Sequence, residues 1–129
     1  MKLLDDVKYD SHGLIPAIAH DDATGDILMM AWMNRTSLEE TVQTNRAVYF
    51  SRSRGKLWRK GEESGNIQEV KSIHIDCDAD VVLLRVNQIG GAACHTGHRT
   101  CFYREVTEGG SSYKEKNDII FDPKEVYKK

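Results

Sequence analysis

The chain has 129 residues, with 18 Lys and Arg against 20 Asp and Glu, and a net charge of −2 at pH 7. This length supports one domain, and the near-neutral charge excludes a globally basic nucleic-acid binder. Its three cysteines are a poor disulfide framework but suit a metal site. The charged N-terminus lacks an apolar stretch, and the longest apolar run, 27–33, is too short to span a bilayer. We therefore expect a cytoplasmic protein with reduced cysteines and no membrane segment.

The first half of the chain predicts a β-hairpin followed by one helix. Residues 1–10 form a polar lead-in. Two apolar runs, 14–20 and 27–33, flank a polar turn segment, which is the pattern of a hairpin. Thr36 and Glu39 have the spacing of a capping box, so we expect a helix of about 36–45 that ends at Asn45.

The rest of the chain predicts mainly strands. Apolar or alternating segments predict strands at 47–51 and 56–60, around a turn at Arg54 and Gly55, and then at 67–75, 81–86 and 101–106. The fold class is α+β, a strand-dominated single domain with one clear helix. We expect the domain to cover residues 1–106. Residues 107–129 are a C-terminal tail with a weak fold signal, packed or partly mobile.

An acidic cluster offers oxygen ligands at alternate positions. Asp76, Asp78 and Asp80 suit Mg²⁺ or Ca²⁺. On a straight strand the first and last would lie roughly 13 Å apart, so this segment must bend if all three bind one ion. An EF-hand is excluded because Val81 and Asn87 occupy its glycine and glutamate positions. The alternative is a solvated acidic turn.

Cysteine and histidine cluster in one glycine-containing segment. Cys94 and Cys101 enclose His95 and His98, and thiolate and imidazole are ligands of Zn²⁺. With Cys77 the chain offers three thiolates, which would leave a fourth position for water, as in catalytic zinc sites. Two alternatives stay open: a histidine closes the site, or the cysteines are simply buried free thiols.

A basic segment, residues 52–60, carries five positive charges in an otherwise slightly acidic chain. Such a local excess favours a small anionic ligand, because arginine grips phosphate with two hydrogen bonds and lysine adds a point charge. The alternatives are a solvated hairpin or an RNA-binding hairpin. The candidate substrate-binding residues are Arg52, Arg54, Lys56, Trp58, Arg59 and Lys60.

These motifs together resemble a known enzyme family. SRSR at 51–54, LW at 57–58, KGE at 60–62, DCDAD at 76–80, ACHTG at 93–97 and CFYR at 101–104 occur in that order. The sequence over residues 14–106 resembles the phosphoribosyl-AMP cyclohydrolases of histidine biosynthesis, in their monofunctional form without a fused pyrophosphohydrolase domain.

The resemblance implies an activity. It is hydrolytic opening of the N1–C6 bond of the adenine ring of 1-(5-phosphoribosyl)-AMP, which gives the phosphoribosyl-formimino-AICAR ribotide by zinc-activated water. The substrate is a small molecule with two phosphates, whose negative charge would explain the excess of positive charge in the basic segment. Neither nucleic acid nor a membrane is expected as a partner. We take His95 as the candidate general base because it adjoins Cys94, although His98 stays open.

The resemblance also implies Zn²⁺ and Mg²⁺ as cofactors and an intertwined homodimer with metal sites at the subunit interface. Cys77, Cys94 and Cys101 then match the zinc positions, shared between subunits. Asp76, Asp78 and Asp80 match the magnesium positions. If residues 76–78 are extended, Cys77 points away from its flanking aspartates and is free to serve a neighbouring subunit.

Two other functions compete with this one. The first is a non-catalytic, zinc-stabilised nucleic-acid-binding module, whose binding would weaken steeply with salt. The second is a zinc purine deaminase, but the His-x-Glu and Pro-Cys-x-x-Cys signatures of that class are missing.

Overall fold

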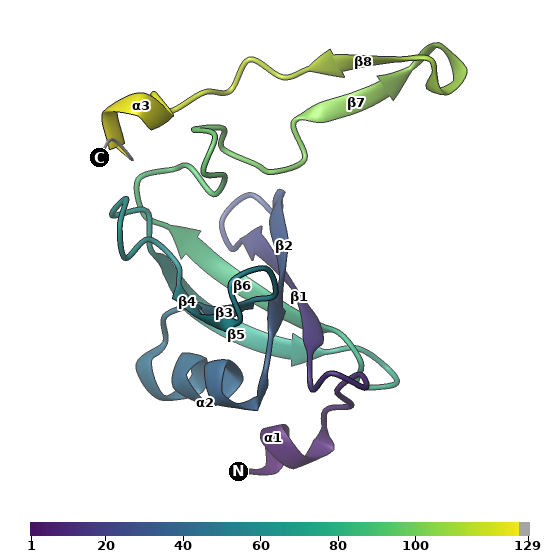
Figure 1. Cartoon of the computed structure of the whole chain (residues 1–129), viewed down its shortest axis with the longest axis vertical. Helices are drawn as coiled ribbons and strands as arrows, with labels where there is room; N and C mark the ends of the chain where they lie inside the picture. The colour runs from purple at the N-terminus through teal and green to yellow at the C-terminus, as the bar shows by residue number, and fades with distance from the viewer. Residues whose placement is uncertain (127–129) are drawn as a thin grey trace.

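The structure is a computed structural model that describes residues 1–126. A sheet forms the body of the molecule, with α1 and α2 at one end and a separate hairpin at the other (Figure 1). No helix among these residues has the length and apolar character needed to cross a membrane. In chain order the elements are α1 (Lys2–Asp6), β1 (Ile15–Asp21), β2 (Ile27–Met33), α2 (Arg35–Thr44), β3 (Val48–Ser51), β4 (Lys56–Arg59), β5 (Gln68–Ile75), β6 (Val82–Gln88), β7 (Arg104–Thr107), a 3-10 turn (Glu108–Gly110), β8 (Ser112–Glu115) and α3 (Pro123–Val126).

Six strands form one sheet in the order β4-β3-β2-β1-β6-β5. The pair β1 and β6 is parallel, and the other neighbours are antiparallel. This confirms the predicted hairpins as β1–β2 and β3–β4, and the predicted strands at 67–75 and 81–86 as β5 and β6. The strand-dominated α+β class is confirmed, with α2 as the one helix of more than two turns within residues 1–126.

The ends of the sheet approach each other. The N–H of Ala47, just before β3, donates to the carbonyl of Gln68 in β5 at 3.0 Å, and the N–H of Val70 donates to the carbonyl of Asn45 at 2.8 Å. A right-handed twist accumulates across neighbouring strands, so a six-stranded sheet can curl until distant strands meet. The basic segment and the β5–β6 pair are therefore parts of one curled body.

The helix α2 begins earlier than predicted. Asn34 is its N-cap: the Asn34 side chain accepts the N–H of Ser37 at 2.8 Å, and the Ser37 hydroxyl accepts the N–H of Asn34 at 2.9 Å. The capping box predicted at Thr36 and Glu39 is therefore wrong, because the asparagine takes the orphan N–H groups first. The predicted end is confirmed, since Asn45 is left-handed with φ 58°.

The hydrophobic core lies between the sheet and the N-terminal helices. Every second residue of 15–19 in β1 is fully buried, as expected for a strand with one face inside. Leu38 of α2 and Leu4 of α1 join this core. Burying such a side chain contributes about 1.5–3 kcal/mol. The lead-in predicted to be merely polar is therefore part of the packed body.

A chain of buried polar side chains crosses the core. The Tyr49 hydroxyl donates to Gln68 Oε1 at 2.6 Å, and Gln68 Nε2 donates to Gln88 Oε1 at 2.9 Å. Gln88 Nε2 in turn donates to the carbonyl of Asn66 at 2.8 Å. Burial raises the pKa of Tyr49, so the phenol stays protonated as a donor. The chain links β3, β5 and β6 without leaving these amides unpaired.

The C-terminal region is less regular than predicted. The strand expected at 101–106 begins only at Arg104, because the Thr100 hydroxyl accepts the N–H of Phe102 at 3.0 Å and turns the backbone. The hairpin of β7 and β8 projects from the body (Figure 1) and exposes 62% of Val106 and 63% of Tyr113. The domain boundary expected after residue 106 falls inside β7.

Candidate active site

A cavity of about 930 Å³ lies beside the β3–β4 hairpin. The hairpin turns at Gly55, whose φ of 64° lies in the left-handed region that favours glycine, and whose N–H donates to the carbonyl of Ser51 at 2.8 Å. The tilted rings of Tyr49 and Trp58, 5.5 Å apart, brace the strands at the cavity wall. The lining residues are Ser51, Arg54, Lys56, Leu57, Trp58, Arg59, Lys60, Gly61, Glu62, Glu63, Ser64, His95 and Pro123.

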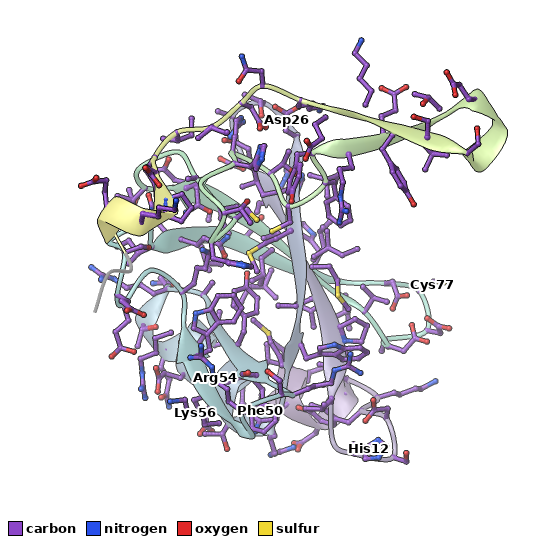
Figure 2. All side chains as sticks on the ribbon, turned by 45° about the horizontal axis from the view of Figure 1, so that its top comes forward. His12, Asp26, Phe50, Arg54, Lys56 and Cys77 are labelled. Carbon is purple, nitrogen blue, oxygen red and sulfur yellow. The ribbon has the colours of Figure 1, made fainter. Side chains whose placement is uncertain are left out.

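The fold brings most of the predicted substrate-binding residues to this cavity. Arg54 and Lys56 lie near the hairpin turn (Figure 2), with Trp58, Arg59 and Lys60 further along β4 and just after it. Arg52 does not line the cavity; its guanidinium lies 4.5 Å from the centre of the Trp32 ring instead. His95 reaches the same cavity from a distant part of the chain.

The cations of the cavity differ in how far they are already neutralised. Arg59 donates from Nε and a terminal nitrogen to the Glu40 carboxylate at 2.6 and 2.9 Å, which lowers the pKa of Glu40. Among the described residues, Arg54 and Lys56 have no ion-pair partner. These two side chains are therefore the most available ligands for an anion.

Lys60 is the buried cation of the site. Only 6% of the residue is exposed, and its ammonium lies 5.6 Å from the centre of the Trp58 ring. Burial lowers the pKa of Lys60, while the nearby thiols of Cys101 and Cys94 act in the opposite direction. The positive charge of Lys60 thus faces the loop that bears both cysteines.

Cys94 and Cys101 meet at the two ends of one loop. The Cys94 sulfur accepts a hydrogen bond from the Thr96 hydroxyl at 2.9 Å, and the Cys94 N–H donates to the carbonyl of His98 at 3.2 Å. A hydrogen bond between the two thiols lowers the pKa of Cys94 to about 5 and raises the pKa of Cys101. The contact between the two thiols thus favours the thiolate form of Cys94, the form in which cysteine binds a metal.

The acidic cluster occupies the turn between β5 and β6. Asp76 Oδ1 accepts the N–H groups of Asp80 and Val81 at 2.9 and 3.2 Å, and Ala79 is left-handed with φ 62°. One carboxylate oxygen from each of the three aspartates lies within 4.8 Å of the others. Hydrogen bonds to Asp78 and then Asp76 raise the pKa of Asp80 to about 6. The segment bends as three ligands of one ion require.

Cys77 lies in this turn, apart from the other thiols. The extended backbone assumed for residues 76–78 is wrong, because a turn begins directly after Ile75. Figure 2 shows Cys77 on the other side of the molecule from Arg54 and Lys56. Within residues 1–126 the aspartates are the sole group of three candidate ligands within 4.8 Å. One chain alone does not bring its three cysteines together.

The two histidines of the cysteine loop have different surroundings. His95 is exposed and lines the cavity. His98 is 8% exposed, its Nδ1 lies 2.5 Å from Asp118 Oδ1, and its ring stacks on Tyr103 at 3.7 Å. His95 is thus the histidine with access to a substrate. Sequence reasoning missed Asp118 because its partner lies 20 residues away, beyond any local motif.

Comparison with known proteins identifies the family of the chain. The family model described as phosphoribosyl-AMP cyclohydrolase matches residues 29–103. The chain belongs to this family. The match contains the basic hairpin, the aspartate turn and the cysteine loop, which confirms the resemblance found from the sequence motifs.

Curated relatives match over nearly the whole chain. The chain is 55% identical over 129 residues to the phosphoribosyl-AMP cyclohydrolase of Thiobacillus denitrificans, covering 98% of this chain and 97% of the relative. It is 57% identical over 125 residues to that of Azotobacter vinelandii, covering 97% and 92%. It is 60% identical over 124 residues to that of Saccharophagus degradans, covering 96% and 95%.

Proposed function

We propose that the chain is a phosphoribosyl-AMP cyclohydrolase of histidine biosynthesis. Its family membership carries this proposal, and the cavity supports it, because basic side chains, an aromatic ring and a histidine line one space. The reaction adds the oxygen of water to C6 of the adenine ring and breaks the N1–C6 bond. Substitution at N1 makes the ring easily protonated, so C6 is open to attack.

The basic hairpin would hold the two phosphates of the substrate. Arg54 and Lys56 are free of ion pairs among the described residues, so phosphate binding breaks no existing bridge on them. Trp58 offers a ring face for the adenine, since stacking on an aromatic side chain suits any base. Glu62 and Glu63 carry negative charge on the same wall, which favours placing the phosphates nearer the hairpin turn.

The cysteine loop fits Zn²⁺. Cys94 and Cys101 lie together, and the low pKa of Cys94 supplies a thiolate without a metal present. When bound, zinc would act as a Lewis acid that makes the attacking water more acidic. His95, on the same loop, would accept the proton of that water and later return it to the leaving nitrogen.

Lys60 would balance the charge of this thiolate site. Three thiolates donate strongly and would blunt the acidity of the attacking water, and a buried ammonium beside them offsets that negative charge. Lys60→Met should therefore shift the rising limb of the kcat–pH profile to higher pH. Lys56→Met, on the open wall, should instead raise KM. An unshifted profile for Lys60→Met would contradict this role.

The aspartate turn fits Mg²⁺, because three clustered carboxylates are hard oxygen ligands. The ion would serve to hold a substrate phosphate or orient the substrate, since magnesium keeps its waters and binds oxygen. The aspartates do not line the cavity within one chain, so this role requires that they approach the cavity of another chain.

A homodimer would complete both metal sites. Cys77 and the aspartates share one turn, away from the cavity, so a partner's turn would bring its thiol and its carboxylates together. The projecting β7–β8 hairpin offers a contact, because a lone two-stranded hairpin with exposed Val106 and Tyr113 is marginally stable by itself. Cys77→Ser should lower both zinc content and dimer stability, and unchanged zinc stoichiometry would exclude Cys77 as a ligand.

The direct test is turnover of phosphoribosyl-AMP by the purified chain with Zn²⁺ and Mg²⁺. Ring-opened product without ammonia supports the proposal. Ammonia release would indicate a deaminase. No turnover together with salt-sensitive RNA binding would indicate the nucleic-acid module. Arg54→Ala should raise KM about tenfold or more, the size of a lost charge-assisted hydrogen bond, whereas Arg52→Ala, outside the cavity, should change it far less.

A further inference from the structure

A segment between β8 and α3 lies against the cysteine loop. We define residues 118–121 as the C-terminal strap. The N–H of Arg99 donates to the carbonyl of Asp118 at 3.1 Å, and the N–H of Ile120 donates to the carbonyl of Gly97 at 2.6 Å. His98 and Ile119 form an antiparallel bridge between these two bonds. The strap therefore pairs with the loop as a short extra strand.

Side chains reinforce this pairing. His98 Nδ1 lies 2.5 Å from Asp118 Oδ1, and both groups are largely withdrawn from water, with 10% and 22% of their side chains exposed. The His98 ring also stacks on Tyr103, with the two rings nearly parallel. A hydrogen bond between an imidazole and a carboxylate is among the stronger side-chain contacts, so this one fixes the loop in one place.

Gly97 allows the close approach of the two segments. A Cβ at this position would lie 2.0 Å from the carbonyl oxygen of Phe121, and its φ of 91° is a conformation that other residues rarely adopt. Gly91 also has a positive φ, of 81°, but a Cβ there meets only the Ile120 side chain, at 4.0 Å. A substitution at either glycine strains the backbone, but only one at Gly97 would also push the strap away.

The opposite side of the loop is anchored to the body. The N–H of Cys101 donates to the carbonyl of Leu28 at 2.7 Å, and Arg99 reaches Asp21 and Asp26 at 3.2 Å each. These bonds fix the Cys101 end. The Cys94 end is joined to His98, because the Cys94 N–H donates to the His98 carbonyl. The strap in turn holds His98 through Asp118.

We infer that the C-terminal strap is a positioning element that brings the Cys94 and Cys101 thiols together before metal binds, with the His98–Asp118 contact as its main fastening. The inference deepens the proposed function, because it rests on these thiols being zinc ligands for its catalytic meaning. The strap lies outside the region that the family model matches, which ends at residue 103. Asp118 acts through His98 and needs no contact with substrate.

The first experiment measures thiol labelling in the metal-free, full-length protein, with the labelled cysteine identified by peptide mass. Asp118→Asn should speed labelling of the buried Cys94 about tenfold or more, because a weakened fastening raises the population of the open loop. Asp122→Asn is the matched control: the same charge is removed four residues away, where, among residues 1–126, the carboxylate accepts only the N–H of Lys124, and labelling should stay within about twofold. An unchanged Cys94 rate in Asp118→Asn overturns the inference.

A second pair of variants guards against general unfolding. Gly97→Ala should open the loop and Gly91→Ala should not, although both place a side chain at positive φ. Asp118→Glu, which keeps the carboxylate, should restore part of the slow labelling. Equal Cys94 rates in both glycine variants, or an Asp118→Glu variant no slower than Asp118→Asn, would contradict a positioning role.

Cobalt(II) provides a spectroscopic readout that separates this inference from the proposed metal site. The wild-type chain should show thiolate-to-cobalt absorption, and Asp118→Asn should lower its intensity at equal cobalt while Asp122→Asn does not. If the wild type shows no such absorption but Asp118→Asn still exposes Cys94, the metal assignment fails and the positioning role stands. If the wild type absorbs and the variant matches it in both measurements, the positioning role fails.

Discussion

The sheet-based body, residues 1–88, and the C-terminal region, residues 89–126, are built differently. The hydrophobic core comes almost entirely from the body, with only Ala93 from the later region. The later region, less than half as long, exposes as many large apolar side chains as the body does, and its hairpin projects from the body (Figure 1). The exposed large apolar residues of this region are Phe102, Val106, Tyr113, Ile119 and Ile120.

This difference separates stability from chemistry. The body supplies almost all of the hydrophobic core, while the C-terminal region carries two of the three thiols and the cavity histidine on a loop held by specific hydrogen bonds. Binding and catalytic groups on loops positioned by a rigid scaffold are a common arrangement. Substitutions in the two regions should therefore change different measurements.

Leu84→Ala should have the largest effect on folding. Leu84 is fully buried in β6, which lies between β1 and β5, and truncation of a buried leucine costs about 2–5 kcal/mol of unfolding free energy. Val106→Ala in the projecting hairpin should cost less than about 0.5 kcal/mol when measured at low concentration, where a dimer is dissociated. Urea unfolding measures both, and similar losses would remove the distinction between the regions.

Cys94→Ser should abolish activity while leaving the fold intact. Loss of even an outer partner of a metal ligand costs about 10–100-fold, so loss of a ligand should lower kcat/KM by more than about 100-fold. The metal-free variant should unfold within about 1 kcal/mol of the metal-free wild type, because the loop contributes little to the core. Full activity would exclude Cys94 from the site, and global unfolding would make the loop part of the scaffold.

Tyr49→Phe tests the polar chain inside the body. Removing the hydroxyl leaves Gln68 Oε1 without its donor in a buried position, which costs about 1–3 kcal/mol of stability. Phenylalanine keeps the ring that packs against Trp58 at the cavity wall, so turnover should fall only slightly. Thermal unfolding and steady-state kinetics on the same sample measure the two effects. A large loss of activity with normal stability would reverse this assignment.

Asp10→Asn should have the smallest effect and should depend on pH. The N–H groups of Leu14 and then His12 hydrogen-bond the Asp10 carboxylate and hold its pKa below 3.8 in the folded state. A depressed folded-state pKa adds stability that is present above the unfolded-state pKa and is lost as pH falls through the folded-state pKa. The variant should thus be slightly less stable than wild type at pH 7, with the difference shrinking as pH falls below 3.8 and lost once the folded-state carboxylate is protonated. A difference that persists in acid would point to another cause.

The sequence predicted best what depends on local pattern. Two apolar runs around the polar turn at 21–26 predict the β1–β2 hairpin correctly. An asparagine, which tolerates the left-handed conformation, predicts the end of α2 correctly. The sequence does not identify the N-cap, because Asn34 with Ser37 and Thr36 with Glu39 both have the spacing of a capping box. The buried leucine of α1 was missed because five helical residues carry no visible period.

The candidate site was predicted in its residues more than in its arrangement. The sequence indicates Lys60 by its charge alone, yet its burial beside Cys94 and Cys101 follows from how the curled sheet meets the loop. Arg52 matches the motif but lies against Trp32, because it falls in the turn after β3, where the side-chain alternation of a strand no longer applies. Asp118 had no signal, because pairing across 20 residues depends on the folded backbone.

The buried chain from Tyr49 through Gln68 and Gln88 has a consequence for how the sheet assembles. Apolar side chains tolerate a strand shifted by two residues nearly as well as the correct alignment, because the same face stays buried. The polar chain does not tolerate such a shift. If β5 moved by two residues, the Tyr49 phenol and the Gln88 amide would lose Gln68 as a hydrogen-bond partner inside the core, at a cost of several kcal/mol. These three side chains therefore disfavour misaligned pairings of β5. The native alignment is the one in which the β3–β4 hairpin and the cysteine loop line the same cavity.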